Sequence, residues 1–216
     1  MYKDVKIRVS LDSEKFDQKP DKGKTLAINS RLARSIEVIA ISELARQLVA
    51  PNSRTFCPSV FNGESRKNDS WVSQQVFALD LDENITIQQA LDRCKEYKVM
   101  PTFIYTSFSH KEEHHKFRMV FILNEEVTDI RVRAFVYHSL ATIFPEVDKQ
   151  TKDAARMFYG GKNIVFEDYN NIITVPQVHF ALTKYIKSTK GRNASREFEK
   201  FAALTGVQLH NGLPNL

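Results

Sequence analysis

The stretch Gln75-Val76-Phe77-Ala78-Leu79-Asp80-Leu81-Asp82 decides the fold, because it joins an uninterrupted apolar run to two aspartates. An apolar run of this length between polar residues predicts a buried β-strand rather than a helix. Alternate side chains of a strand share a face, which puts Asp80 and Asp82 on one side with Cα atoms about 7 Å apart. Two carboxylates so placed repel each other unless a cation neutralises them. The pair fits a Mg²⁺ or Mn²⁺ site, and the simpler interpretation is that both aspartates only end the strand.

The chain that follows alternates helices and strands. Thr86 and Gln89 form a capping box, which predicts the start of a helix. The expected elements are, in order, a helix to about residue 97, strands at 102–106 and 116–123, a helix from 128 that Pro145 stops, and a short strand at 156–159. With the first strand this gives β-α-β-β-α-β, the ferredoxin-like arrangement of an antiparallel sheet with two helices on one face. We therefore expect an α/β protein of the α+β class, whose fold alone assigns no function.

The flanking regions predict an extension on each side of this core. Before it, a strand at 5–11, a charged loop at 12–24 and a helix at 30–49 form an N-terminal α/β module over about residues 1–70. After it, the expected elements are strands at 163–166 and 172–175 joined by a turn, a helix at about 194–204 and ten disordered terminal residues. The domain assignment is a catalytic domain at 1–185, with its core at about 72–162, and a basic C-terminal helix and tail at 186–216 that would link to a missing region.

Composition places this chain among ordinary globular proteins, with 42% hydrophobic and 26% charged residues in a length of 216. The two cysteines have no zinc-ligand spacing, and no apolar run is long enough to span a membrane. The N-terminus has no apolar signal-peptide core, so we expect a cytoplasmic protein. The net charge of +5 favours an anionic partner such as nucleic acid or a nucleotide.

Side chains suited to phosphate follow the second strand of the core. Ser107 and Ser109 offer hydroxyl groups and His110 follows them directly. Arg118 and Arg156 lie on predicted strands among apolar residues, where an arginine needs a partner. Either arginine can neutralise a triphosphate through its planar fork, or it can form a structural ion pair.

A third carboxylate after the second long helix would complete a two-metal site, since such sites need several carboxylates around ions about 3.5–4 Å apart. Asp148 is the preferred candidate and Asp153 the alternative. Basic residues elsewhere can follow a template backbone or simply be solvated; they are Arg66, Lys67, Lys187, Lys190 and Arg192.

Together these residues resemble the archaeo-eukaryotic primase superfamily, the primase-polymerases. The family pattern is Asp-x-Asp at a strand end, then small-x-His, then an apolar residue followed by Asp. It corresponds here to Asp80-Leu81-Asp82, the run ending at His110, and Val147-Asp148. Phe108 stands where a serine or threonine is usual, between two serines. The stretches 66–71 and 148–161 are similar to the versions found in phages and plasmids, and the resemblance spans about residues 55–161.

The resemblance implies a metal-dependent nucleotidyltransferase that synthesises or extends primers on single-stranded DNA, for replication of a mobile element. It implies a palm domain in which Asp80, Asp82 and Asp148 hold two Mg²⁺ or Mn²⁺ ions. His110 would contact the phosphates of the incoming nucleoside triphosphate. Family members often have a helicase on the same polypeptide, so a helicase in cis or in trans is an expected partner.

Three other interpretations compete with this one. A phosphatase of the haloacid dehalogenase type also begins with a strand ending in Asp-x-Asp, although it requires a doubly wound parallel sheet. A non-catalytic RRM-like module would bind nucleic acid through exposed aromatic residues on its central strands. His110, His114 and His115 have spacing seen in zinc sites, but their charged surroundings favour a solvated loop.

Overall fold

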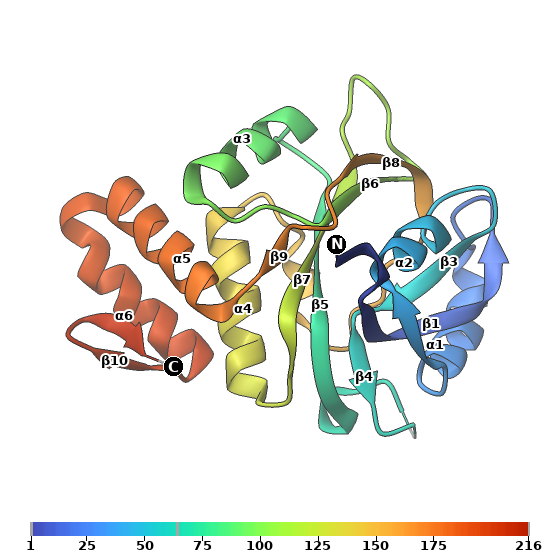
Figure 1. Ribbon diagram of the computed structural model, residues 1–216, viewed down its shortest axis with the longest axis horizontal. Helices are drawn as coiled ribbons and strands as arrows, with labels where there is room; N and C mark the ends of the chain where they lie inside the picture. The colour runs from blue at the N-terminus through green and yellow to red at the C-terminus, as the bar shows by residue number, and fades with distance from the viewer. Residues whose placement is uncertain (1, 64, 216) are drawn as a thin grey trace.

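Two sheets pack against each other, and helices cover the outer face of the larger one (Figure 1). The computed structural model describes residues 2–63 and 65–215. The N-terminal sheet has the order β2-β1-β3 and contains β1 (Lys6–Phe16), β2 (Ile36–Ala40) and β3 (Ser53–Cys57). The central sheet has the order β4-β5-β7-β6-β8, with β9 paired to β7, and contains β4 (Ser59–Phe61), β5 (Trp71–Leu81), β6 (Phe103–Ser107), β7 (Phe117–Val127), β8 (Gly161–Glu167) and β9 (Ile172–Ile173).

Strand β5 is buried on both faces, which explains its continuous apolar run. Phe77 and Leu79 point into a core formed with helices of the outer layer. Val76 and Ala78 point into a second core, which β5 shares with the N-terminal sheet. Because side chains alternate along a strand, Asp80 faces the N-terminal sheet. The site therefore lies between the two sheets, at the end of β5.

The outer layer contains α3 (Ile87–Tyr97), α4 (Ile130–Ile143), α5 (Val175–Lys190) and α6 (Ala194–Thr205), whereas α1 (Thr25–Leu32) and α2 (Ile41–Gln47) belong to the N-terminal module. Three of the outer helices correspond to expected helices, but α5 is not predicted from the sequence. The predicted capping box is present, because Thr86 accepts from the amide of Gln89, whose side chain accepts from the Thr86 amide. Phe201 of α6 packs edge-on against Phe135 of α4, so α6 adds to the same core. Among the described residues, no helix is both long enough and apolar enough to cross a membrane.

The α+β class and the order β5-α3-β6-β7-α4 agree with the prediction, and β5 and β7 lie at the centre as expected. The predicted fourth strand at 156–159 is wrong. This segment forms only an isolated bridge between Phe158 and Phe56 of the N-terminal sheet. The edge beside β5 is occupied by β4, and β8 pairs with β6 instead. The segment 156–159 thus connects the two sheets rather than extending one of them.

A pair of glycines continues this connection, and we call residues 158–161 the seam. The amide of Gly161 donates to the carbonyl of Leu48 over 2.8 Å, and its carbonyl accepts from Ala50 over 2.9 Å. Gly161 also pairs with Ser107 at the start of β8. A Cβ atom on Gly161 would lie 1.8 Å from the carbonyl oxygen of Thr106. Only glycine allows the backbone to pass this close to β6.

Three local predictions at the ends of the chain are also wrong. The helix expected at 30–49 is interrupted by β2, whose β-branched residues pair with β1, so sheet pairing overrides the helical spacing. The strands β8 and β9 do not pair with each other, because β9 aligns parallel to β7. The last residues, expected to be disordered, form a hairpin of β10 (Gln208–His210) and β11 (Leu213–Asn215). Asn211 and Gly212 both have positive φ, as a tight hairpin turn requires.

We predict that acid weakens the fold through His138 of α4. Burial, aided by the positive charges of Arg133 and Lys152, lowers the pKa of His138 to about 4. In the unfolded chain the ring takes up a proton near its ordinary pKa of 6.5, so stability falls as the pH drops from 6.5 toward 4. The expected loss is on the order of 1 kcal/mol, given the partial exposure of the ring. Denaturant unfolding of His138→Gln and wild type at pH 7 and 4.5 checks this; an unchanged pH dependence in the variant contradicts it.

Candidate active site at the junction of the two sheets

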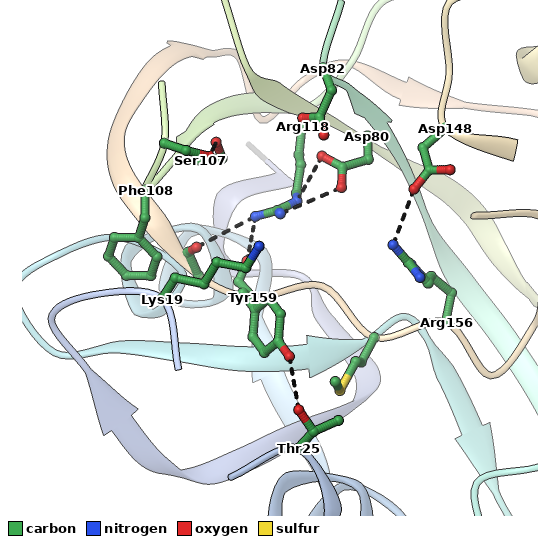
Figure 2. Close-up of a pocket in the computed structure, with 13 residues that line it drawn as sticks. Lys19, Thr25, Asp80, Asp82, Ser107, Phe108, Arg118, Asp148, Arg156 and Tyr159 are labelled. Atoms are coloured by element: carbon green, nitrogen blue, oxygen red, sulfur yellow. Dashed lines mark hydrogen bonds and ion pairs between the residues drawn. The ribbon is translucent and has the colours of Figure 1, made fainter. Parts of the chain in front are cut away.

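A pocket of about 350 Å³ lies where the end of β5 meets the N-terminal module (Figure 2). It is lined by Lys19, Thr25, Asp80, Asp82, Ser107, Phe108, Ser109, Arg118, Asp148, Arg156, Met157, Tyr159 and Gly160. Figure 2 shows the three aspartates along one side, Lys19, Thr25 and Tyr159 on the other, and the arginines between them. The lining thus combines three carboxylates with three cationic side chains.

Asp80 is the most buried of the three acids, with 6% of its surface exposed. It lies opposite Arg118 in the pairing of β5 with β7, and Arg118 Nε is 3.1 Å from Asp80 Oδ1. The approach is poorly directed for a hydrogen bond, so Oδ1 has no hydrogen-bond partner among the described residues. Burial raises the pKa of Asp80, and the attraction of Arg118 offsets this only in part. A buried carboxylate oxygen without a hydrogen bond would be stabilised by a further cation.

Arg118 connects the acids to the seam. Its Nη1 donates to the carbonyl of Tyr159 over 2.6 Å, and its guanidinium lies over the ring of Tyr105, with 5.5 Å to the centroid. Burial works against the cation, but Asp80 and Tyr105 outweigh it and raise the pKa of Arg118. Arg118 thus forms an ion pair with Asp80, as expected of a structural arginine, and it also lines the pocket.

Asp82 follows β5 and is much more open than Asp80, with 45% of its side chain exposed. Its closest cation is Lys116, whose Nζ lies 3.9 Å from Oδ2. The ring of His114 donates from Nε2 to the Asp82 carbonyl over 3.0 Å, which holds this part of the backbone. Asp80 and Asp82 both line the pocket, as their alternation along the chain predicted.

Asp148 reaches the pocket because its own backbone is attached to β5. Its amide donates to the carbonyl of Asp80 over 2.9 Å. The carboxylate accepts from the amide of Gln150 and, over 3.2 Å, from Arg156 Nη2. Thr151 donates to the Asp148 carbonyl and lies 2.6 Å from the hydroxyl of Tyr137, so helix α4 supports the turn. Asp153 lies outside the pocket lining, where it accepts from the amide of Ala155.

The hydroxyl-rich turn after β6 forms another wall. Ser107 and Ser109 line the pocket with their hydroxyl oxygens 3.3 Å apart, and Phe108 lines it between them. His110 lies next to this wall and outside the lining itself. Its Nδ1 accepts from the amide of Lys116 over 3.1 Å, so a neutral ring has its proton on Nε2. Burial, aided by His115, lowers the pKa of His110, which favours that neutral form.

The basic residues considered for template binding lie outside the pocket lining. Arg66 donates to the side chain of Asn29 on α1, and Lys67 is exposed beside it. Lys187, Lys190 and Arg192 are exposed at the end of α5, which Figure 1 shows on the opposite side of the central sheet from the N-terminal module.

Three polar side chains of the pocket, those of Lys19, Thr25 and Tyr159, are not identified from the sequence. Lys19 lies in a charged loop that resembles any solvated loop, so no pattern singles it out. Tyr159 was assigned to a strand, although the glycine pair after it was a visible sign of a close backbone approach. The hydroxyl groups of Thr25 and Tyr159 are 3.5 Å apart, which joins α1 to the seam.

The structure excludes two of the competing interpretations. Strand β5 is antiparallel to both β4 and β7, so the sheet is not the parallel sheet of a haloacid dehalogenase. The inner face of the central sheet is covered by the N-terminal sheet, so it is not available as an RRM-like platform. In the described part of the chain no group of three or more His, Cys, Asp and Glu side chains is arranged to hold a metal ion.

The acids are nevertheless suited to a hard divalent cation. Such ions take carboxylate oxygens, and three carboxylates line this pocket. Asp80 Oδ1 is buried without a hydrogen bond, and the oxygens of Asp82 have only the distant Lys116 as a cationic partner. In this structure Asp80 forms an ion pair with Arg118, and Asp148 forms one with Arg156.

Comparison with known proteins gives one structural likeness. No known protein family matches the chain, and a search of curated proteins finds no match. The AEP domain of the primase-polymerase of cyanophage S-2L superposes with a TM-score of 0.48 and 8% sequence identity, covering 84% of this chain and 90% of that chain. A likeness of this degree assigns no function, so any assignment depends on the residues of the pocket.

Proposed function

We propose that the protein is a metal-dependent nucleotidyltransferase that extends primers on single-stranded template, as a DNA primase-polymerase does. One observation carries this proposal: Asp80, Asp82 and Asp148 share a single pocket with Arg118 and Arg156. Three carboxylates together with two guanidinium groups in one pocket match what a metal-bound triphosphate requires. The sequence resemblance described above points to the same chemistry.

In this proposal, the 3′-hydroxyl of the primer attacks the α-phosphorus of the incoming nucleoside triphosphate, and pyrophosphate leaves. Asp80, Asp82 and Asp148 would hold two Mg²⁺ or Mn²⁺ ions. When bound, such ions activate the attacking hydroxyl and stabilise the charge of the leaving group. Arg118 and Arg156 fork onto phosphate oxygens, while Ser107 and Ser109 donate hydrogen bonds to them. Catalysis then depends on position and electrostatics, since phosphoryl transfer needs little covalent help from the protein.

The third acid provides the test of this function. We expect Asp148→Asn to lower the extension rate at least about 100-fold, since even outer partners of metal ligands contribute 10–100-fold. Asp153→Asn removes the same charge five residues away, outside the pocket, and should be nearly silent. The measurement is extension of a labelled primer on single-stranded template as a function of Mn²⁺ concentration. Inactivation by Asp153→Asn would mean that the third ligand is misassigned. Absence of any extension by the wild-type protein would remove the proposed function.

A second prediction concerns His110. Its Nε2 is available to donate to a phosphate, because Nδ1 is occupied by the Lys116 amide. We expect His110→Ala to weaken binding of a nucleoside triphosphate with Mn²⁺ by about tenfold, the value of a hydrogen bond to a charged group, and to leave binding of single-stranded DNA unchanged. His210→Ala, on the exposed C-terminal hairpin, is the control. Calorimetric titration with each ligand measures both affinities, and equal loss of the two would indicate a folding defect instead.

A further inference from the structure

The loop between β1 and α1 forms a second hollow beside the proposed active site. This hollow measures about 390 Å³, and Lys19 lines both it and the first pocket. Its other lining residues are Lys15, Phe16, Asp17, Gln18, Pro20, Asp21 and Lys24. We call residues 15–24 the lysine loop. Because Lys19 belongs to both hollows, a chain-like ligand leaving the first pocket on this side reaches the second.

The lysine loop presents positive charge that the protein does not neutralise. Lys15, Lys19, Lys22 and Lys24 are exposed, and none forms an ion pair within 4 Å among the described residues. The two aspartates of the loop accept hydrogen bonds from backbone amides, Asp17 from Asn52 and Asp21 from Lys24. The carboxylate of Glu43 on α2, which interacts electrostatically with Lys15, accepts from Arg46 and Gln47.

Aromatic rings accompany two of these lysines. The amino group of Lys24 lies over Phe16, 5.6 Å from its centroid, and that of Lys19 lies over Tyr159, 5.9 Å from its centroid. Figure 2 shows Lys19 and Tyr159 side by side at the edge of the pocket. Proteins that bind single strands combine lysines or arginines along the backbone with rings on which bases stack. This combination occurs at two places, at Lys24 with Phe16 of the lysine loop and at Lys19 with Tyr159 of the seam.

We propose that the lysine loop and Tyr159 bind single-stranded nucleic acid where it enters the active-site pocket. This proposal rests on the proposed function, and it assigns the surface to which the single-stranded nucleic acid would bind. Phosphates lie along the lysines, and bases stack on Phe16 and Tyr159. A polyanion fits this surface, because four exposed lysines, without an ion pair among the described residues, outnumber the two aspartates of the loop, and Lys19 connects the hollow to the pocket.

The end of α5 is the competing surface. Lys187, Lys190 and Arg192 are also exposed there, but they line neither hollow and lie across the central sheet from the pocket. Among the described residues none of these three cations lies over an aromatic ring, unlike Lys19 and Lys24. The two surfaces therefore provide a matched comparison with equal numbers of charges removed.

The experiment compares Lys15→Gln/Lys24→Gln with Lys187→Gln/Lys190→Gln, both in the full chain. Anisotropy of a short labelled oligo-deoxythymidine is measured between about 50 and 200 mM salt. We expect the first variant to bind at least tenfold more weakly, with a slope of log affinity against log salt reduced by about 1.4, because about 0.7 is lost per phosphate contact on a single strand. The α5 variant should stay within about twofold of wild type. Phe16→Leu should weaken binding without changing the slope, since stacking releases no counterions.

Two outcomes would overturn the inference: an unchanged affinity in the lysine-loop variant, or a larger loss in the α5 variant. Calorimetry with a nucleoside triphosphate and Mn²⁺ serves as the second readout. Both double variants should retain that binding, because Lys15 and Lys24 lie outside the first pocket. If wild type binds the oligonucleotide through the loop but does not bind the nucleotide, the proposed function fails and the binding surface stands. If it binds the nucleotide while the loop has no role, only the inference fails.

Discussion

Asp82→Asn should abolish nucleotide transfer while leaving the free energy of unfolding within about 0.5 kcal/mol of wild type. The carboxylate is nearly half exposed, and its only ion pair among the described residues is the 3.9 Å contact with Lys116, so the fold loses little. The site, in contrast, loses one of three acids that would hold the ions. Extension rate against Mn²⁺ concentration and denaturant unfolding measure the two effects separately.

Asp80→Asn should remove activity as well, but with a cost to folding. It leaves the buried guanidinium of Arg118 without its carboxylate, and breaking a buried pair costs about 3–5 kcal/mol. Asp92→Asn on the exposed side of α3 is the control for both aspartates and should change neither property. Full activity in Asp82→Asn would refute the metal-site assignment, whereas equal stability of Asp80→Asn and wild type would refute the account of the buried pair.

Gly161→Ala should strongly destabilise the fold. The new methyl group would lie 1.8 Å from the carbonyl oxygen of Thr106, which is backbone and cannot rotate away. Either β8 separates from β6 or the hydrogen bonds to Leu48 and Ala50 break. We expect a loss of about 3 kcal/mol or more, at the upper end of the cost of overpacking. Urea unfolding monitored by circular dichroism measures the change in the free energy of unfolding.

Gly23→Ala is the matched control for that substitution. Its added Cβ meets only the Asp21 side chain, at 3.2 Å, and the backbone there has no positive φ. The expected change is within about 0.5 kcal/mol. If the two variants were equally stable, the seam would not have the tight backbone contact described above.

Local sequence patterns predicted the core of the fold correctly. They gave wrong predictions for segments whose structure depends on pairing with residues far away in the sequence. The capping box at Thr86 and the apolar run of β5 act within a few residues, so the sequence pattern predicts them correctly. The segment 36–40 has helical spacing, but pairing with β1 makes it a strand. The segment 156–159 has strand-like composition, but it connects two sheets. The relative position of these sheets cannot be predicted from a local sequence pattern.

The candidate site shows the same division. Alternation along β5 places Asp80 and Asp82 together, and the sequence was sufficient to predict that. The placement of Asp148 depends on a backbone hydrogen bond to Asp80 from a turn far along the chain, so the sequence could offer Asp148 only as the preferred candidate, with Asp153 as the alternative. Lys19 enters the pocket only because the two sheets pack face to face, and a lone lysine in a charged loop gives no sign of that.

The seam has a consequence for how a ligand can enter. Phe158 pairs with Phe56 through two backbone hydrogen bonds of 2.9 and 2.7 Å, and Gly161 binds the neighbouring Leu48 and Ala50 while pairing with β6. Arg118 adds a side-chain bond from β7 to the same segment. The two walls of the pocket are therefore joined along this backbone segment by several hydrogen bonds. If the pocket has the proposed function, we expect side-chain rotation of the carboxylates, rather than separation of the two sheets, to accommodate the ligand.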